Sequence, residues 1–184
     1  MPDDEATKSF RVLLETTKGT VVIQVHRDWA PLGADRFREL VEAGYYSDVA
    51  FFRVLPGFVA QFGISGDPTL SSQWRDKAIK DDPSGKSNIR GTITFAMAGP
   101  NTRTTQLFIN YGDNARLDEM GFSPFAEVVE GMEHVDALYS GYGEGAPHGR
   151  GPDQGRLQRE GNAHLRADFP KLDYLVSASV VAEG

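Results

Sequence analysis

The sequence predicts a mainly β fold, a barrel or a sandwich whose openings are covered by helices, and three observations support this class. Several short runs are rich in β-branched and aromatic residues and alternate with the period of two that strands show. Two segments carry apolar residues at helical spacing. The 20 glycines and 10 prolines are spread along all 184 residues, so many turns must separate short elements.

The N-terminal part indicates a hairpin followed by a helix. Residues 10–27 contain two β-rich runs on either side of Lys18 and Gly19, and glycine supplies the positive φ of a tight hairpin turn. Residues 28–44 carry Pro31 near a first turn, apolar residues at helical spacing and a closing glycine. This pattern predicts an amphipathic helix.

The rest of the chain alternates between strand patterns and loops. Residues 65–90 are loop-like, and residues 131–140 predict a second helix. From Ser140 to Arg156 there are six glycines in seventeen residues, which predicts a long surface loop. Strand patterns occur at residues 51–64, 91–98, 106–112, 122–129 and 171–181.

Composition narrows the classes of partner. The formal net charge of −7 argues against nucleic acid and against anionic membranes. No cysteine is present, so thiol catalysis and disulfides are excluded. The start of the chain has no signal-peptide pattern, and no run is apolar enough for a membrane span. We expect one cytoplasmic domain, residues 1–184, with an ordered core at about residues 8–182.

Familiar catalytic motifs fail on inspection. A nucleophile elbow needs glycines two residues to either side of the serine, and Ser65 has Gly63 on one side but Asp67 on the other. The sequence GYGEGA follows a predicted helix, where a dinucleotide fingerprint requires a strand, and Glu144 would repel pyrophosphate. The histidines lack the spacing of a zinc site: His26, His134, His148 and His164.

Polar residues inside apolar strands are more informative. Arg53, Gln61 and Gln106 each interrupt such a run. Alone, the arginine could extend to a sheet edge and the glutamines could satisfy buried backbone groups. Together with Phe58, Phe108 and a strand that has one small-residue face, they indicate a groove with aromatic walls and a few polar groups.

Two blocks of sequence resemble the cyclophilin-type peptidyl-prolyl cis-trans isomerases. They are FFRVLPGFVAQFG, residues 51–63, and AMAGPNTRTTQLFI, residues 96–109. The correspondence continues through residues 116–138 and covers roughly residues 9–140, and the C-terminal residues 161–181 look like a bacterial or plastid-type variant. The resemblance implies a closed antiparallel eight-stranded β-barrel capped by two α-helices.

The resemblance also implies site residues and an activity. The activity is rotation about X-Pro amide bonds in peptides and in unfolded or flexible protein segments, which assists folding and needs no cofactor or metal. The implied catalytic residues are Arg53, Phe58 and Gln61. The implied substrate-binding residues are Ala96, Met97, Gln106, Phe108, Leu117 and Phe122.

Departures from the family pattern lead to further expectations. Arg116 stands where many cyclophilins carry a tryptophan that contributes to cyclosporin binding, so we expect weak cyclosporin binding. Phe52 replaces a common histidine, Met97 replaces a common asparagine, and Phe122 stands where a histidine is often found. Proline-containing peptides and client proteins are the expected partners of a monomer.

Two other functions stay open on sequence grounds. The fold could serve as a non-catalytic prolyl-peptide binding module or chaperone, or a hydrolase could be built around Ser65, although no base is apparent.

In a regular strand Phe58 and Gln61 would point to opposite faces because their spacing is odd. A bulge or corner is therefore expected within residues 57–61.

Overall fold

The fold is mainly β and antiparallel, as predicted. The computed structural model describes residues 9–83 and 85–183; residues 1–8, 84 and 184 of the expected domain, including the expected start of the ordered core at residue 8, lie outside this part. Within the described residues there are nine strands: β1 (Phe10–Thr16), β2 (Gly19–Val25), β3 (Val49–Ala50), β4 (Arg53–Leu55), β5 (Val59–Phe62), β6 (Thr92–Phe95), β7 (Leu107–Asn110), β8 (Ala126–Glu130) and β9 (Tyr174–Glu183).

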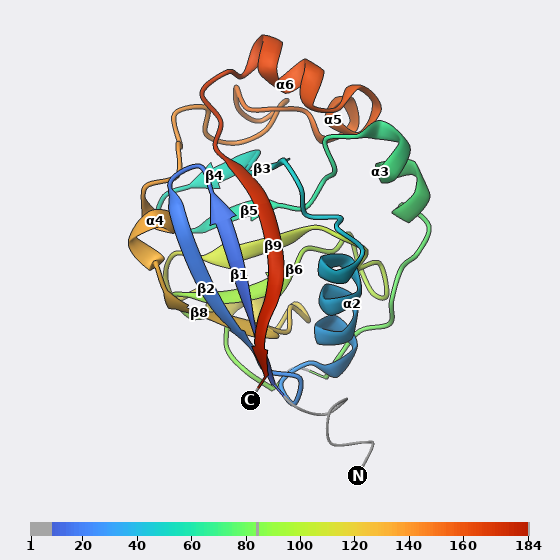
Figure 1. Ribbon diagram of the computed structural model, residues 1–184, viewed down its shortest axis with the longest axis vertical. Helices are drawn as coiled ribbons and strands as arrows, with labels where there is room; N and C mark the ends of the chain where they lie inside the picture. Colours follow the sequence, from blue (N-terminus) through green and yellow to red (C-terminus); the bar gives the residue numbers. More distant parts are fainter. Residues whose placement is uncertain (1–8, 84, 184) are drawn as a thin grey trace.

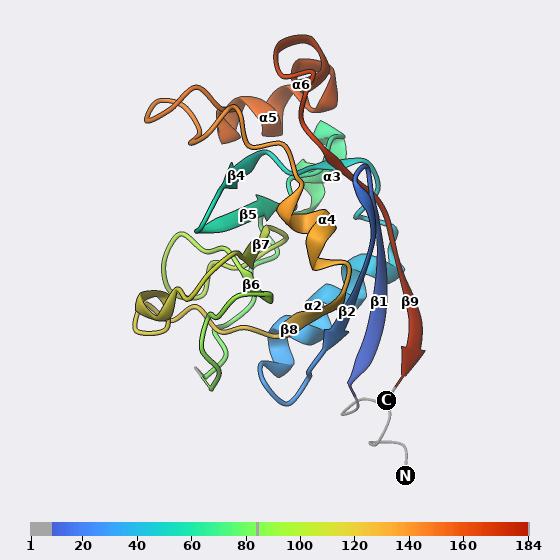
Figure 2. The same ribbon diagram turned by 90° about the vertical axis from the view of Figure 1, so that its left-hand side faces the viewer.

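The strands form one curled sheet in the order β3-β9-β1-β2-β8-β6-β7-β5-β4 (Figures 1 and 2). Its two edges, β3 and β4, are successive parts of one chain segment, separated by Phe51 and Phe52. In the described part of the chain no ladder joins β3 to β4, so the hydrogen bonding is that of a half-barrel. The expected closed eight-stranded barrel is corrected accordingly, because this segment breaks into two short strands with different partners.

The helices are more numerous than the two expected. The described residues contain α2 (Pro31–Glu42), α3 (Pro68–Trp74), α4 (Met132–Asp136), α5 (Gln154–Glu160), α6 (Asn162–Asp168) and one 3-10 turn, η1 (Ala115–Leu117). The predictions of α2 and of a helix at α4 are confirmed. The segment at residues 65–90, expected to be a loop, contains α3. This helix begins at Pro68, and the Asp67 side chain caps its N-terminus. Helices α5 and α6 are too short for their periodicity to show clearly.

A large apolar core holds α2 to the sheet. Phe37 and Leu40 of α2 are fully buried beside Phe62, Phe95 and Phe125 in the main cluster. Phe37 packs on Phe125 with ring centroids 5.2 Å apart. The amphipathic pattern of α2 therefore turns its apolar face to the sheet, and α2 lies along β9 (Figure 1).

A second apolar cluster docks the C-terminal helices beyond the end of the sheet, next to α3 (Figure 1). It joins Phe52 and Ile64 from the β3–β5 region to Leu157 of α5 and Leu165 of α6. Phe52 is 2% exposed, so its apolar side chain is part of this packing. Phe52, which stands where the family often has histidine, is thus packed against the two C-terminal helices.

Residues 140–172, which carry α5 and α6, form an excursion from the sheet whose two ends are held by Asp173. Asp173 accepts a hydrogen bond from the backbone N–H of Tyr139 at 2.7 Å and another from the Thr17 hydroxyl at 2.7 Å. Its own carbonyl oxygen accepts from the N–H of Phe51. Residues 140–172 therefore leave and rejoin the sheet at adjacent positions.

A buried ion pair joins the long connection before β6 to the loop between β6 and β7, and its carboxylate also bonds to the start of α2. Arg103 donates to Asp82 at 3.1 Å, and their side chains are 5% and 1% exposed. Asp82 also accepts from the N–H groups of Leu32 and Gly33, which Ala30 at the N-cap has no side-chain group to satisfy. One carboxylate thus fixes both a loop and a helix end. Among the described helices, none is long and apolar enough to cross a membrane.

Removing Arg103 should therefore be costly. We expect Arg103→Met to lower the free energy of unfolding by about 3 kcal/mol, because Asp82 would remain buried without its counter-charge. Arg90→Met is the matched control, since the Arg90–Asp136 pair is 48% and 42% exposed and such pairs contribute about 0–1 kcal/mol. Urea denaturation measures both, and equal losses would contradict the assignment.

Candidate active site

The hairpin of β4 and β5 places the first three candidate residues. Arg53 and Gln61 are directly opposed across this ladder, so their side chains leave the same face. Gly57, with φ of +79°, makes the turn, and the N–H of Phe58 bonds to the carbonyl of Leu55 at 2.9 Å. Phe58 thus precedes β5 and is free of strand alternation. The corner predicted within residues 57–61 is confirmed.

A cavity of 270 Å³ opens beside this hairpin. Its floor is a small apolar cluster, separate from the main core, formed by Val59, Phe108 and Leu117 with Phe58 and Phe122 packed against it. An apolar cluster that lines a cavity, beside polar groups at its edge, is typical of a binding site. The cavity is lined by Arg53, Phe58, Val59, Gln61, Ala96, Met97, Phe108, Leu117, Phe122 and Gln154.

Eight of the nine predicted site residues line this cavity. They come from four parts of the chain: the β4–β5 hairpin, the residues just after β6, β7, and η1 with the turn that follows it. Phe108 and Phe122 meet edge to face, with centroids 5.7 Å apart, and form one wall. Val59 and Gln154 were not predicted; Gln154 begins α5, which sequence patterning did not reveal.

The ninth predicted residue, Gln106, supports the site from behind. Arg53 donates from Nη1 to Oε1 of Gln61 at 2.9 Å, and Nε2 of Gln61 donates to Oε1 of Gln106 at 2.9 Å. Gln61 is 6% exposed and keeps one further N–H on its amide. The guanidinium also lies 5.8 Å from the ring of Phe58. The three polar residues singled out in the sequence therefore form one chain of hydrogen bonds.

The Gly-rich segment reaches this site through a residue that sequence reasoning did not select. Glu144 accepts from Nε of Arg53 at 2.6 Å and from Nη2 at 2.8 Å, a bidentate ion pair. The hydrogen bonds from Arg53 hold the pKa of the Glu144 carboxyl below its usual value. An acidic residue flanked by two glycines was the available signal, but a separation of 91 positions along the chain hid its contact with Arg53.

A buried polar network holds the aromatic wall in place. Asn88, fully buried, donates to the carbonyl of Phe122 at 2.9 Å and accepts from the Thr94 hydroxyl at 2.7 Å. Asp118 accepts from the side-chain amide of Asn88 at 2.7 Å and from the Ser87 hydroxyl at 2.6 Å. The turn that carries Phe122 is thus tied to β6. Thr94 lies on the strand whose one face has small residues, and its hydroxyl reaches Asn88 directly.

Comparison with known proteins decides the family. Residues 11–153 match the family described as cyclophilin type peptidyl-prolyl cis-trans isomerase/CLD.

The chain belongs to the cyclophilin-type peptidyl-prolyl cis-trans isomerases.

Curated relatives of this cyclophilin carry the same activity in their names. Peptidyl-prolyl cis-trans isomerase A of Dickeya dadantii is 36% identical over 147 residues, which are 74% of this chain and 75% of the relative. Peptidyl-prolyl cis-trans isomerase B of Escherichia coli is 30% identical over 181 residues, or 94% and 99% of the two chains. The predicted family and enzyme class are therefore confirmed.

Solved structures support the cyclophilin fold. A Cryptosporidium parvum cyclophilin-type isomerase matches with a TM-score of 0.69 and 20% identity, covering 94% of this chain and 98% of that one. A second structure of the same protein, in the presence of the dipeptide Ala-Pro, matches with a TM-score of 0.68 at 20% identity, covering 93% and 98% of the two chains. The expected cyclophilin-like fold is confirmed at the level of a curled antiparallel sheet with helices.

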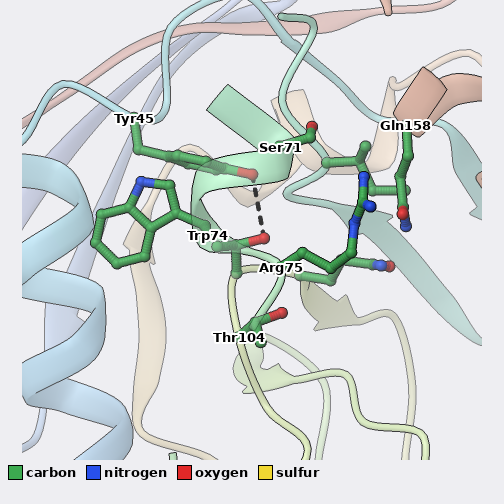
Figure 3. A pocket seen from close by; sticks show the side chains of 9 residues that line it. Tyr45, Ser71, Trp74, Arg75, Thr104 and Gln158 are labelled. Atoms are coloured by element: carbon green, nitrogen blue, oxygen red, sulfur yellow. Dashed lines mark hydrogen bonds between the residues drawn. The ribbon is translucent and has the colours of Figure 1, made fainter. Parts of the chain in front are cut away.

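A second cavity of the cyclophilin domain lies beside Gln106 (Figure 3). Its volume is 60 Å³, room for a few water molecules at about 10–15 Å³ each by this measure. The hydroxyl of Tyr45 at its side bonds to the Thr105 hydroxyl at 3.1 Å and is engaged within the protein (Figure 3). In the described residues no group of three or more acidic, histidine or cysteine side chains could hold a metal ion.

The carboxylate behind the aromatic wall should be visible in the pH dependence of stability. Burial alone would raise the pKa of Asp118. The hydrogen bonds from Ser87 and Asn88 together lower this pKa by more than burial raises it, so the net shift is downward. A depressed folded-state pKa gives stability that is complete above the unfolded value of about 3.9 and is lost as the pH falls through the folded value.

We therefore expect Asp118→Asn to be less stable than wild type by a constant amount above about pH 5, and by a shrinking amount below about pH 4. Chemical denaturation at a series of pH values measures this difference. A difference that stays constant to about pH 2.5 would contradict the assignment.

Proposed function

We propose that this chain catalyses rotation about X-Pro bonds of peptides and flexible protein segments in the 270 Å³ cavity, with Arg53 as the principal catalytic residue. The observation that supports the assignment is convergence: one guanidinium, one hydrogen-bonding amide and an apolar aromatic cavity meet at a single place. Membership of the family indicates the reaction, and this geometry supports the roles proposed for the residues.

The chemical problem is the partial double bond of the amide. Sharing of the nitrogen lone pair with the carbonyl sets a barrier of about 18–20 kcal/mol, and uncatalysed X-Pro isomerisation is slow. Twisting the bond localises the lone pair on nitrogen. A cation aimed at that nitrogen interacts more strongly with the twisted state than with the planar one, and each ~1.4 kcal/mol of this difference gives a tenfold rate.

Arg53 suits that role because of its surroundings. Its side chain is 23% exposed, so its charge acts through a partly desolvated environment beside Phe58 rather than through bulk water. Arginine stays charged at any physiological pH and offers donors in a fixed plane. The reaction forms and breaks no covalent bond, so no nucleophile or base is needed.

The remaining cavity residues hold the two ends of the bond. The apolar cluster of Phe108, Leu117 and Phe122 takes the proline ring, since its surface is aromatic and aliphatic. Gln61 uses one amide N–H on Gln106 and has a second for the substrate carbonyl. Fixing the ring while the carbonyl side swings concentrates the motion in one dihedral angle.

The binding partners of the protein are proposals. Proline-containing peptides and client proteins fit a cavity that is open and apolar, with its polar groups at one side. The monomeric state and the cytoplasmic location stay predictions.

A binding module or chaperone without turnover is the competing function. The bidentate pair with Glu144 offsets part of the Arg53 charge, and this observation favours the competitor. Rate measurements separate the two.

We expect Arg53→Ala to lower kcat/KM on an Ala-Pro peptide by about 100-fold or more, the effect of removing one transition-state donor. Arg27→Ala is the control, because Arg27 pairs with Asp35 on the surface away from the cavity. A coupled assay measures both. If wild type and Arg53→Ala both gave the uncatalysed rate, the binding-module function would replace the enzyme.

Cyclosporin provides a second test. Arg116 is exposed, with its guanidinium 5.1 Å from the centroid of the Phe58 ring, and stands where the family often has tryptophan. We expect weak inhibition of the wild type and stronger inhibition of Arg116→Trp, since an indole buries more apolar surface against the inhibitor. Nanomolar inhibition of the wild type in the same peptide assay would contradict this prediction.

A further inference from the structure

Glu144 fixes one edge of the Arg53 guanidinium. Its two carboxylate oxygens take Nε and Nη2, while Gln61 takes Nη1. A guanidinium has five N–H donors, so three are bound within the protein and two remain. Because a bidentate bond fixes the plane as well as the position of the group, the two remaining donors have a set direction.

The carboxylate is itself held by its loop. Oε1 of Glu144 accepts from the backbone N–H of Gly145 at 2.8 Å in addition to Arg53. The Glu144 carbonyl accepts from the N–H of Gly151 at 2.8 Å, and Gly149 closes a turn on Gly145 at 3.1 Å. The loop therefore delivers Glu144 in one orientation, with both ends of the residue bonded.

Glycine at position 149 is required by this packing. A β-carbon added to Gly149 would stand 2.2 Å from the carbonyl oxygen of Glu144 and 2.9 Å from the β-carbon of Glu144. At position 85, by contrast, the nearest atom to an added β-carbon would be 4.0 Å away. The glycines of the segment thus allow close approach of backbone to Glu144, which is one physical reason for their abundance.

We propose that Glu144 is a positioning residue for the isomerase reaction: it holds Arg53 in the plane from which its free donors face the proline site. The proposal rests on the proposed function of Arg53. Glu144 acts through Arg53 and contacts no reacting atom.

The physical gain is preorganisation. An unrestrained arginine would have to lose rotamer freedom each time the twisted state forms, whereas the clamped one loses it on folding. Glu144 also reduces the charge that Arg53 presents, which opposes the gain. The Glu144 side chain is 37% exposed and the Arg53 side chain 23%, so water screens part of the field of the carboxylate, whereas the orientation that it gives to the donors is not screened. We infer that orientation dominates.

The test is a double-mutant cycle on the full chain. Glu144→Gln is expected to lower kcat about tenfold with KM changed less than about twofold, because the apolar proline site is untouched. In an Arg53→Ala background the same substitution is expected to have no further effect. Glu130→Gln, at an exposed residue on β8, is the matched control and should keep wild-type kcat.

Gly149→Ala tests the same idea from a distance. It should lower kcat by a similar factor and add nothing to Glu144→Gln, while Gly85→Ala should keep wild-type kcat. Thermal unfolding and circular dichroism identify a variant that fails to fold, and the Glu144→Gln cycle then carries the test alone.

The outcomes are distinct. Equal losses from Glu144→Gln with and without Arg53 would show a general structural role and overturn the proposal, and so would unchanged or increased kcat in the single variant. If the wild type itself showed only the uncatalysed rate, the proposed function would fail before this inference is reached.

Discussion

The structure depends on one seven-residue segment, Val49 to Leu55, that pairs with β9 at its beginning and with β5 at its end. It connects both edges of the curled sheet by the covalent chain instead of a ladder. Three successive side chains then enter three environments: Phe51 the main core, Phe52 the second apolar cluster, and Arg53 the cavity. The position of the catalytic candidate is therefore set by its neighbours' burial, since moving Arg53 would expose two phenylalanines.

The site combines an apolar pocket with a line of polar contacts, Glu144–Arg53–Gln61–Gln106. Each partner fixes the next, so the arginine has little freedom although its side chain reaches solvent. This arrangement is suited to a reaction in which an amide only rotates. Binding energy from the proline ring and the direction of a few donors are all that the protein can contribute.

Much of this site could be predicted because its signals are local. Arg53 and Gln61 interrupt apolar runs, and Pro56-Gly57 is a dipeptide typical of a turn. The small residues on one face of β6 include Thr94, whose hydroxyl bonds to Asn88. Glu144 could not be found in this way, because its contact with Arg53 depends on how a long excursion docks. Helices α5 and α6 were missed because seven residues are too few to show a clear helical period. The closed barrel of eight strands was implied by the family resemblance, which does not show that Phe51 and Phe52 separate two short strands with different partners.

The clasp between Tyr139 and Asp173 has an evolutionary consequence. Because residues 140–172 start and finish at neighbouring points, their length and sequence can change while the sheet stays intact, as loop-closure entropy grows slowly with length. Residues 140–172 can therefore be exchanged as a unit without changing the pairing of the strands that flank them. A change in this segment would alter the electrostatic surroundings of Arg53, while the apolar residues Phe108, Leu117 and Phe122 of the cavity stay unchanged.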